Sequence, residues 1–96
     1  MKMINKCIYY SISSVLPLLS GYRVSLGEDV PVSQIKEIIV SSTSFYELED
    51  MRLYYGSTRI EDTILPVEYG IVVNDNIRYE LTLVHRNQYG EFPPTP

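Results

Sequence analysis

Few residues in this chain of 96 could do acid–base, nucleophilic or metal chemistry. Its one histidine, His85, and its one cysteine, Cys7, lie near opposite ends, and neither belongs to a catalytic motif or a metal-binding cluster. The acidic pairs at residues 49–50 and 61–62 stand at loop edges, where solvation or capping explains them better than acid–base work. We therefore expect no catalytic residue, no metal, no cofactor and no small-molecule substrate, so the segment is predicted not to be an enzyme.

Charge and cysteine content limit the partners and the compartment. Eight Lys and Arg against twelve Asp and Glu give a formal net charge of −4, which disfavours binding to nucleic acid or to anionic membranes. A single cysteine cannot form an internal disulfide, which indicates a reducing compartment, cytoplasmic or nuclear. With 45% hydrophobic and 21% charged residues, the composition is that of one globular domain.

Residues 1–21 allow two interpretations. A basic start followed by an apolar stretch imitates a secretory signal. Pro17 and several serines interrupt that stretch, however, and large apolar residues alternate from 8 to 12 as they do in a β-strand. We therefore favour a strand, a loop over 17–21 and a second strand at 22–26, and no apolar run is long enough to span a bilayer.

A helix is predicted after this hairpin. Val32, Ile35 and Ile39 are spaced three and four residues apart, which places them on one helix face. Pro31 suits the beginning of the helix, and the serine–threonine run at 41–44 ends it because those side chains compete for backbone hydrogen bonds.

Residues 51–62 are predicted to form a strand, a tight turn and a second short strand. Side chains alternate along a strand, so Leu53 and Tyr55 face the core while Arg52 and Tyr54 face solvent.

The last predicted strand covers residues 77–83, after an Asn-Asp-Asn turn at 74–76. A loop with at most one helical turn is expected at 63–70. The domain is predicted to span residues 1–86, followed by a proline-containing linker or tail at 87–96.

The order of these elements predicts an α+β fold of the β-grasp type, a mixed sheet of four to five strands packed on one helix. Segment 51–62 resembles the middle of ubiquitin, where an arginine, a leucine, two apolar residues, a glycine turn and a Leu-Glu-Asp run follow in the same order. The helix segment 32–39 is also similar to that of ubiquitin. The chain thus resembles the ubiquitin-like domains over about residues 7–84.

The end of the chain departs from conjugated members of that family, which present a terminal Gly-Gly carboxylate to activating enzymes. The glycine that follows the last predicted strand, Gly90, precedes Glu91. The resemblance therefore implies an integral, non-conjugated domain that stays in its parent chain and docks other proteins.

The resemblance also implies a binding face on the sheet. Ubiquitin's apolar patch corresponds here to Leu18 or Leu19, Tyr54, Arg78 and Glu80, and a receptor for that apolar patch would have to desolvate the two charged residues. Tyr54 between two arginines has the composition that favours interfaces, although the same residues would also suit an ordinary solvated sheet face. The candidate partner-binding residues are Leu18, Leu19, Arg52, Tyr54, Arg78 and Glu80.

One structural pair is implied as well. Lys36 and Asp62 match a largely buried lysine–aspartate pair of ubiquitin, and the helix spacing puts Lys36 beside Ile35 at the border of the buried face.

The leading functional hypothesis is a non-catalytic protein-interaction module that docks partners of the ubiquitin–proteasome system to its parent protein. One alternative is a Ras-associating-type module, which pairs its second strand with a partner's edge strand and needs positive charge there, where only Arg23 and Lys36 serve. Another is a self-associating scaffold with an exposed patch of Leu16, Leu18 and Leu19.

Overall fold

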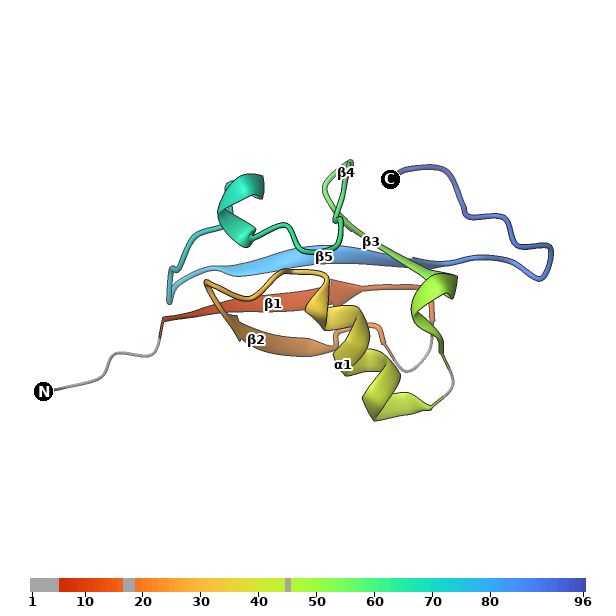
Figure 1. Ribbon diagram of the computed structural model, residues 1–96, viewed down its shortest axis with the longest axis horizontal. Helices are drawn as coiled ribbons and strands as arrows, with labels where there is room; N and C mark the ends of the chain where they lie inside the picture. Colours follow the sequence, from red (N-terminus) through yellow and green to blue (C-terminus); the bar gives the residue numbers. More distant parts are fainter. Residues whose placement is uncertain (1–5, 17–18, 45) are drawn as a thin grey trace, which may run out of the picture.

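The computed structural model describes residues 6–16, 19–44 and 46–96. The elements are β1 (Cys7–Ser13), β2 (Arg23–Gly27), α1 (Gln34–Thr43), the 3₁₀ turn η1 (Leu48–Asp50), β3 (Met51–Tyr55), β4 (Thr58–Arg59), the 3₁₀ turn η2 (Pro66–Tyr69) and β5 (Arg78–His85). The strands form one sheet in the order β2-β1-β5-β3-β4, in which β1 and β5 run parallel and every other pair is antiparallel. The helix α1 lies on one side of this sheet (Figure 1). The predicted β-grasp fold, a mixed sheet with one helix, is confirmed.

The hydrophobic core lies between the sheet and α1. Alternate residues of each central strand point into it, because successive strand side chains face opposite sides. The helix adds two fully buried isoleucines at the predicted spacing. The buried core residues of these elements are Ile8, Tyr10, Ile12, Ile35, Ile39, Met51, Leu53, Tyr79, Leu81 and Leu83.

The helix ends within the predicted serine–threonine run. The Thr43 hydroxyl donates a hydrogen bond of 2.9 Å to the Ile39 carbonyl. Ser44 then adopts a left-handed conformation with φ 62°, and its N–H donates to the Val40 carbonyl. This local bonding stops the helix after Thr43, as the sequence predicts.

The predicted tight turn joins β3 to β4 at Gly56, whose φ of 62° suits glycine. β4 places Arg59 opposite Tyr54 and Thr58 opposite Tyr55. Beyond β4, the Tyr69 hydroxyl accepts a hydrogen bond of 2.8 Å from the Glu61 N–H, which ties η2 to the chain that leaves the hairpin.

The last strand begins one residue later than predicted. The Asn74 side chain accepts a hydrogen bond from the Asn76 N–H, and the Asn74 carbonyl accepts one from the Ile77 N–H. This turn occupies the backbone of Ile77, so β5 starts at Arg78, and the side chain expected in the core is 43% exposed. The assignment of Ile77 to the strand was therefore wrong.

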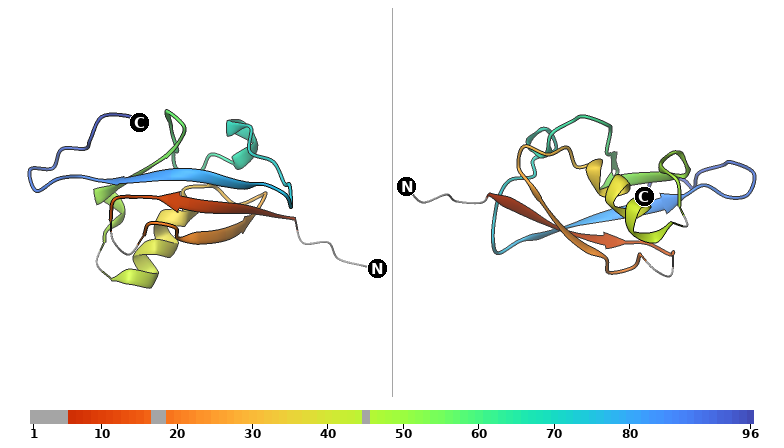
Figure 2. Two further views of the ribbon diagram at one scale, coloured as in Figure 1. Left: turned by 180° about the vertical axis from the view of Figure 1, so that it is seen from behind. Right: turned by 60° about the horizontal axis from the view of Figure 1, so that its bottom comes forward.

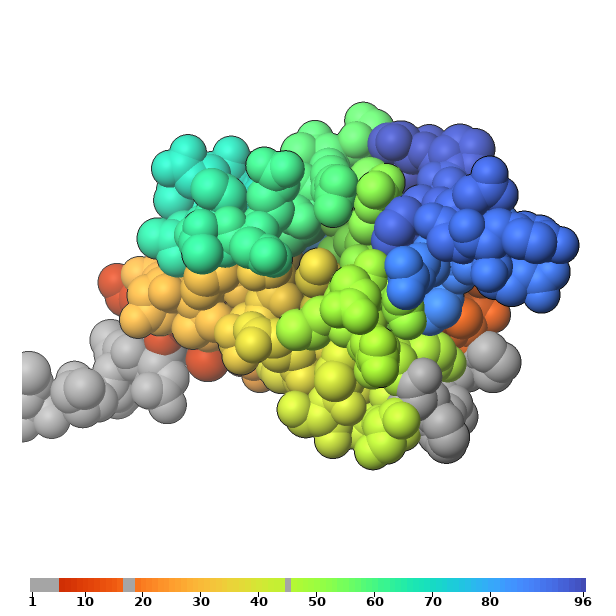
Figure 3. Space-filling view, turned by 45° about the vertical axis from the view of Figure 1, so that its right-hand side comes forward, coloured from red at the N-terminus to blue at the C-terminus, as the bar shows by residue number. Residues whose placement is uncertain are grey.

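The chain after β5 reverses direction. Asn87 pairs its N–H with the Glu91 carbonyl, and its side-chain oxygen accepts hydrogen bonds from the N–H groups of Tyr89 and Glu91. The tail of residues 87–96 then runs back beside β3 and β4 rather than away from the domain (Figures 1 and 2). In the space-filling view the blue tail rests against the green β3–β4 segment (Figure 3).

Candidate functional site

The candidate site is the outer face of the sheet, opposite α1. The parallel pairing of β1 with β5 sets Tyr9 beside Arg78 and Ser11 beside Glu80. These residues alternate with core residues on both strands, so their side chains share the outer face. Arg78 and Glu80 are exposed there, while Tyr9 and Ser11 are half-buried.

Tyr9 and Arg78 form a stacked pair on this face. The Arg78 guanidinium carbon lies 5.5 Å from the centroid of the Tyr9 ring, a cation–π distance. Arg78 Nη1 also donates a hydrogen bond of 3.1 Å to the Tyr10 carbonyl, which fixes the guanidinium over the strand. A hollow of about 310 Å³ opens beside the pair, and its lining residues are Tyr9, Asp75, Asn76, Ile77 and Arg78. An aromatic face, a held cation and an exposed isoleucine thus meet at one surface depression.

The structure separates the predicted partner-binding residues. Arg78 and Glu80 lie exposed on the outer face, as expected. Leu19 does not, because its side chain is 0% exposed and belongs to the hydrophobic core. Its backbone N–H and carbonyl close tight turns with Leu16 and Tyr22, which direct the side chain inward. Leu18 lies outside the described residues.

Tyr54 lies on the predicted outer face of the sheet, but it is buried there rather than exposed. Its register partner Thr82 and its opposite residue Arg59 confirm that it points away from α1. The residue is nevertheless only 2% exposed, so neighbouring side chains on that face cover it. The expectation of an exposed Tyr54 was wrong, because alternation along a strand gives the face but not what covers it.

A residue of the tail contacts Arg52, which neighbours Tyr54 on the same face. The Arg52 guanidinium carbon lies 3.9 Å from the centroid of the Phe92 ring, so a side chain of the tail stacks on one of β3. Pro93 lines a hollow of about 480 Å³ together with Thr82 and Val84 at the same end of the outer face. The tail therefore covers the β3 end of the face and leaves the Tyr9–Arg78 end open.

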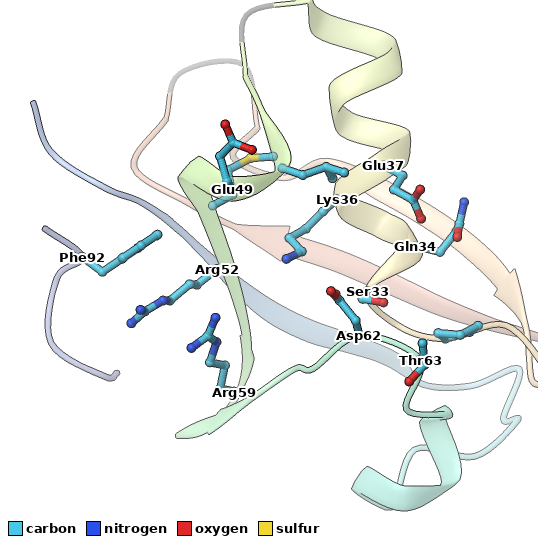
Figure 4. Close-up of a pocket in the computed structure, with 13 residues that line it drawn as sticks. Ser33, Gln34, Lys36, Glu37, Glu49, Arg52, Arg59, Asp62, Thr63 and Phe92 are labelled. Carbon is cyan, nitrogen blue, oxygen red and sulfur yellow. The ribbon is translucent and has the colours of Figure 1, made fainter. Parts of the chain in front are cut away.

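Lys36 and Asp62 line one cleft between α1 and the β3–β4 hairpin, but they do not form the predicted ion pair (Figure 4). In the part of the chain that the structure describes, both ion pairs are made by Asp50, with Arg86 and with His85. Asp62 is exposed, so water can solvate its carboxylate and no lysine is needed to neutralise it.

Comparison with known proteins defines the fold. No family model and no curated protein matches the chain. Among solved structures, the N-terminal ubiquitin-like domain of the 4931431F19Rik protein matches with a TM-score of 0.66 at 15% identity, covering 92% of this chain and 83% of that one. The fold is ubiquitin-like. The Arabidopsis thaliana protein At2g32350 matches with a TM-score of 0.65 at 20% identity, covering 85% of this chain and 89% of that one.

At these identities the likeness shows the ubiquitin-like fold and nothing finer.

Within the described residues, no group of three or more His, Cys, Asp and Glu side chains is arranged to hold a metal ion. The helices found among those residues are also too short or too polar to cross a bilayer.

The sequence analysis missed three residues of the outer sheet face and its neighbouring tail: Tyr9, Arg59 and Phe92. Tyr9 alternates with the core residues Ile8 and Tyr10, which was a signal for an outward side chain. Its partner Arg78 lies 69 positions away, and only the parallel register brings the two together. No local pattern placed Phe92 against β3.

Proposed function

We propose that this chain is a non-catalytic protein-interaction module of the integral, non-conjugated ubiquitin-like kind. It docks partners of the ubiquitin–proteasome system to its parent protein in the cytoplasm or nucleus. The observation that carries this proposal is the Tyr9–Arg78 pair beside an open hollow on the outer sheet face. Tyrosine and arginine are the residue types that most often dominate the binding energy of protein interfaces.

The chemistry of this face selects the partner. Arg78 and Glu80 are exposed beside Tyr9, so a partner must bring an apolar or aromatic side chain for the hollow and polar groups of matching charge around it. A receptor shaped for a wholly apolar patch would leave both charges desolvated and unpaired. The proposed partners therefore differ in their contact residues from receptors of such a patch.

The surroundings of the single histidine support a non-catalytic role. His85 Nδ1 lies 2.6 Å from the Arg86 carbonyl oxygen, and its ring packs edge-on against Tyr46 with centroids 5.7 Å apart. Asp50 neighbours its other nitrogen and also pairs with Arg86. These contacts tie the end of β5 to η1, which gives the histidine a structural task.

The experiment is a binding titration of the purified chain against isolated proteasome regulatory particles. We expect Tyr9→Ala and Arg78→Glu to weaken binding by about tenfold or more, as hot-spot residues do. Tyr89→Ala is the matched control, because that tyrosine is 78% exposed on the tail. Thermal unfolding of each variant separates lost binding from lost folding. Equal binding by all variants, or no binding by the unaltered chain, would refute the proposal.

A Ras-associating-type module is the second candidate, favoured by the position of β2 at one edge of the sheet. Its charge requirement is poorly met. Arg23 lies on β2, whereas Lys36 lines a cleft with β3 and β4 residues at the opposite edge. A shared basic surface does not form. The self-associating alternative also loses one of its leucines, because Leu19 is in the core.

A further inference from the structure

Three cationic side chains converge on the cleft at the β3–β4 edge of the sheet. Lys36 enters it from α1, Arg52 from β3 and Arg59 from β4 (Figure 4). The cleft holds about 740 Å³ and is open to solvent. Because Arg59 stands opposite Tyr54, two residues beyond Arg52, the two arginines are diagonal neighbours on one sheet face.

These cations have no anionic partner among the described residues. Glu37, Glu49 and Asp62 also line the cleft. None of them pairs with these cations, because both ion pairs among the described residues are made by Asp50. In addition, Arg52 Nε is buried and lacks a hydrogen-bond partner within the same described ranges. A charged donor without an acceptor is costly, so the Arg52 guanidinium gains from any anion in the cleft that its other N–H groups can reach.

Phe92 orients the Arg52 guanidinium for binding an anion. Its ring stacks on the Arg52 guanidinium at 3.9 Å from centroid to Cζ. Stacking occupies the face of the planar guanidinium and leaves the N–H donors at its edge, where they can form two parallel hydrogen bonds to one oxyanion. The tail thus immobilises one side chain of the cleft and supplies part of its wall.

We propose that this cleft binds a phosphate monoester group on a segment of a partner protein. Arg52 and Arg59 grip the phosphate oxygens from two sides, and Lys36 adds a third positive charge. A phosphate monoester carries about −1.5 to −2 charges and three acceptor oxygens at neutral pH, so it suits two guanidinium forks better than one carboxylate does.

The protein carrier rests on the proposed function as an interaction module, whereas the phosphate chemistry rests on the cleft alone. The test therefore uses three probes: inorganic phosphate, a capped Ala-phosphoserine-Ala peptide and the same peptide without phosphate. Each is titrated into isotopically labelled protein at constant ionic strength while the amide and arginine Nε–H signals are followed by NMR. We expect saturable changes at Arg52 and Arg59 with both phosphate probes and none with the unphosphorylated peptide.

Variants decide whether these residues make the site. We expect Arg52→Gln and Arg59→Gln each to weaken binding of the phosphopeptide by about tenfold, the effect of one charged hydrogen bond. Phe92→Ala should weaken it less, since it frees Arg52 without removing it. Arg23→Gln is the control, because that exposed arginine lies on the far edge strand.

Several results would overturn the proposal: equal shifts with both peptides, no shifts with either phosphate probe, or unchanged binding in Arg52→Gln. Tyr9→Ala is expected to leave phosphopeptide binding unchanged because Tyr9 does not line the cleft. An unaltered chain that binds the phosphopeptide but not the proteasome particles would therefore refute the proposed function and support the cleft. The reverse pattern would refute the cleft and leave the proposed function standing.

Discussion

The hydroxyl of Tyr10 is buried in the core without a hydrogen-bond partner among the described residues. Its neighbour Tyr79, with ring centroids 6.4 Å apart, is satisfied instead, since its hydroxyl bonds both the N–H and the carbonyl of Val72. Removing an unsatisfied buried hydroxyl relieves a desolvation cost, so Tyr10→Phe should raise the free energy of unfolding by about 1 kcal/mol. Tyr79→Phe should lower it by a similar amount. Urea unfolding measures both, and a destabilised Tyr10→Phe would show that this hydroxyl has a partner.

Burial, with a smaller contribution from the nearby Tyr79 phenol, raises the pKa of Tyr10 far above its ordinary value of 10.0. Above pH 10 the unfolded chain loses this proton while the folded chain keeps it, so stability falls as pH rises. The Tyr10→Phe variant has no phenol to ionise at this position, so it lacks this contribution to the pH dependence of stability. Urea unfolding between pH 9 and 11 should therefore show a shallower loss of stability in the variant, whereas parallel curves would contradict the burial of an ionisable group here.

Tyr54 shows how far a single residue can be predicted. Its face followed from the alternation of β3, but its burial depends on the side chains around it on neighbouring strands, which the alternation of β3 alone does not reveal. Tyr54→Ala should cost about 3 kcal/mol of unfolding free energy, as large-to-small changes of buried aromatic residues do. Tyr89→Ala, at a position 78% exposed, should cost almost nothing. A urea midpoint for Tyr54→Ala equal to that of the control would show that the ring is dispensable for folding.

Secondary structure was predictable wherever local signals act alone. Periodicity located β1, β2, α1 and β3, and turn residues located the breaks between them. Two predictions failed at turns: the exposure of Leu19, which the family resemblance implied, and the burial of Ile77, which the alternation of the last strand implied. Each residue lies in a turn whose backbone hydrogen bonds orient the side chain, and a turn has no repeat from which to read a face.

The contacts that build the two candidate surfaces could not be predicted in this way. Tyr9 meets Arg78 only through the parallel register of β1 and β5, and Phe92 meets Arg52 only through the reversal at Asn87. The ion pair of Lys36 with Asp62 was implied by family resemblance, but the open cleft leaves Asp62 to water. Nonlocal packing, rather than propensity, determines such sites.

The turn η2 is fastened to the β3–β4 hairpin by the bond from the Glu61 N–H to the Tyr69 hydroxyl. Tyr69→Phe removes the acceptor and should lower the unfolding free energy by about 1 kcal/mol. The local signature is faster hydrogen exchange of the Glu61 amide, with exchange in β1 changed only by the global loss. Tyr89→Phe controls for the loss of a hydroxyl on an exposed ring. Unchanged exchange at Glu61 would show that its amide is protected by another group.

Across the molecule, the tail borders both candidate surfaces, the outer sheet face and the cationic cleft. Its Phe92 covers Arg52 at the β3 end of the outer face, and its Pro93 lines a hollow there with Thr82 and Val84. The tail leaves the Tyr9–Arg78 hollow open and completes the wall of the cationic cleft. A segment with the composition of a flexible linker therefore divides one sheet face into a covered part and an exposed part.

The turn at Asn87 is what returns the tail to the sheet. Its side-chain oxygen accepts two hydrogen bonds, from the N–H groups of Tyr89 and Glu91, at 2.8 and 3.0 Å. Asn87→Ala removes both and should release residues 88–96, with a global stability loss of no more than about 1–2 kcal/mol because the core is untouched. We expect faster amide exchange at Glu91, cleavage of the tail by a nonspecific protease at low enzyme ratio, and loss of the NMR contacts between Phe92 and Arg52. Gln88→Ala, at an exposed neighbouring position, is the control. If Asn87→Ala kept the Phe92–Arg52 contacts and the protease resistance of that control, stacking on Arg52 rather than the turn would be what holds the tail in place.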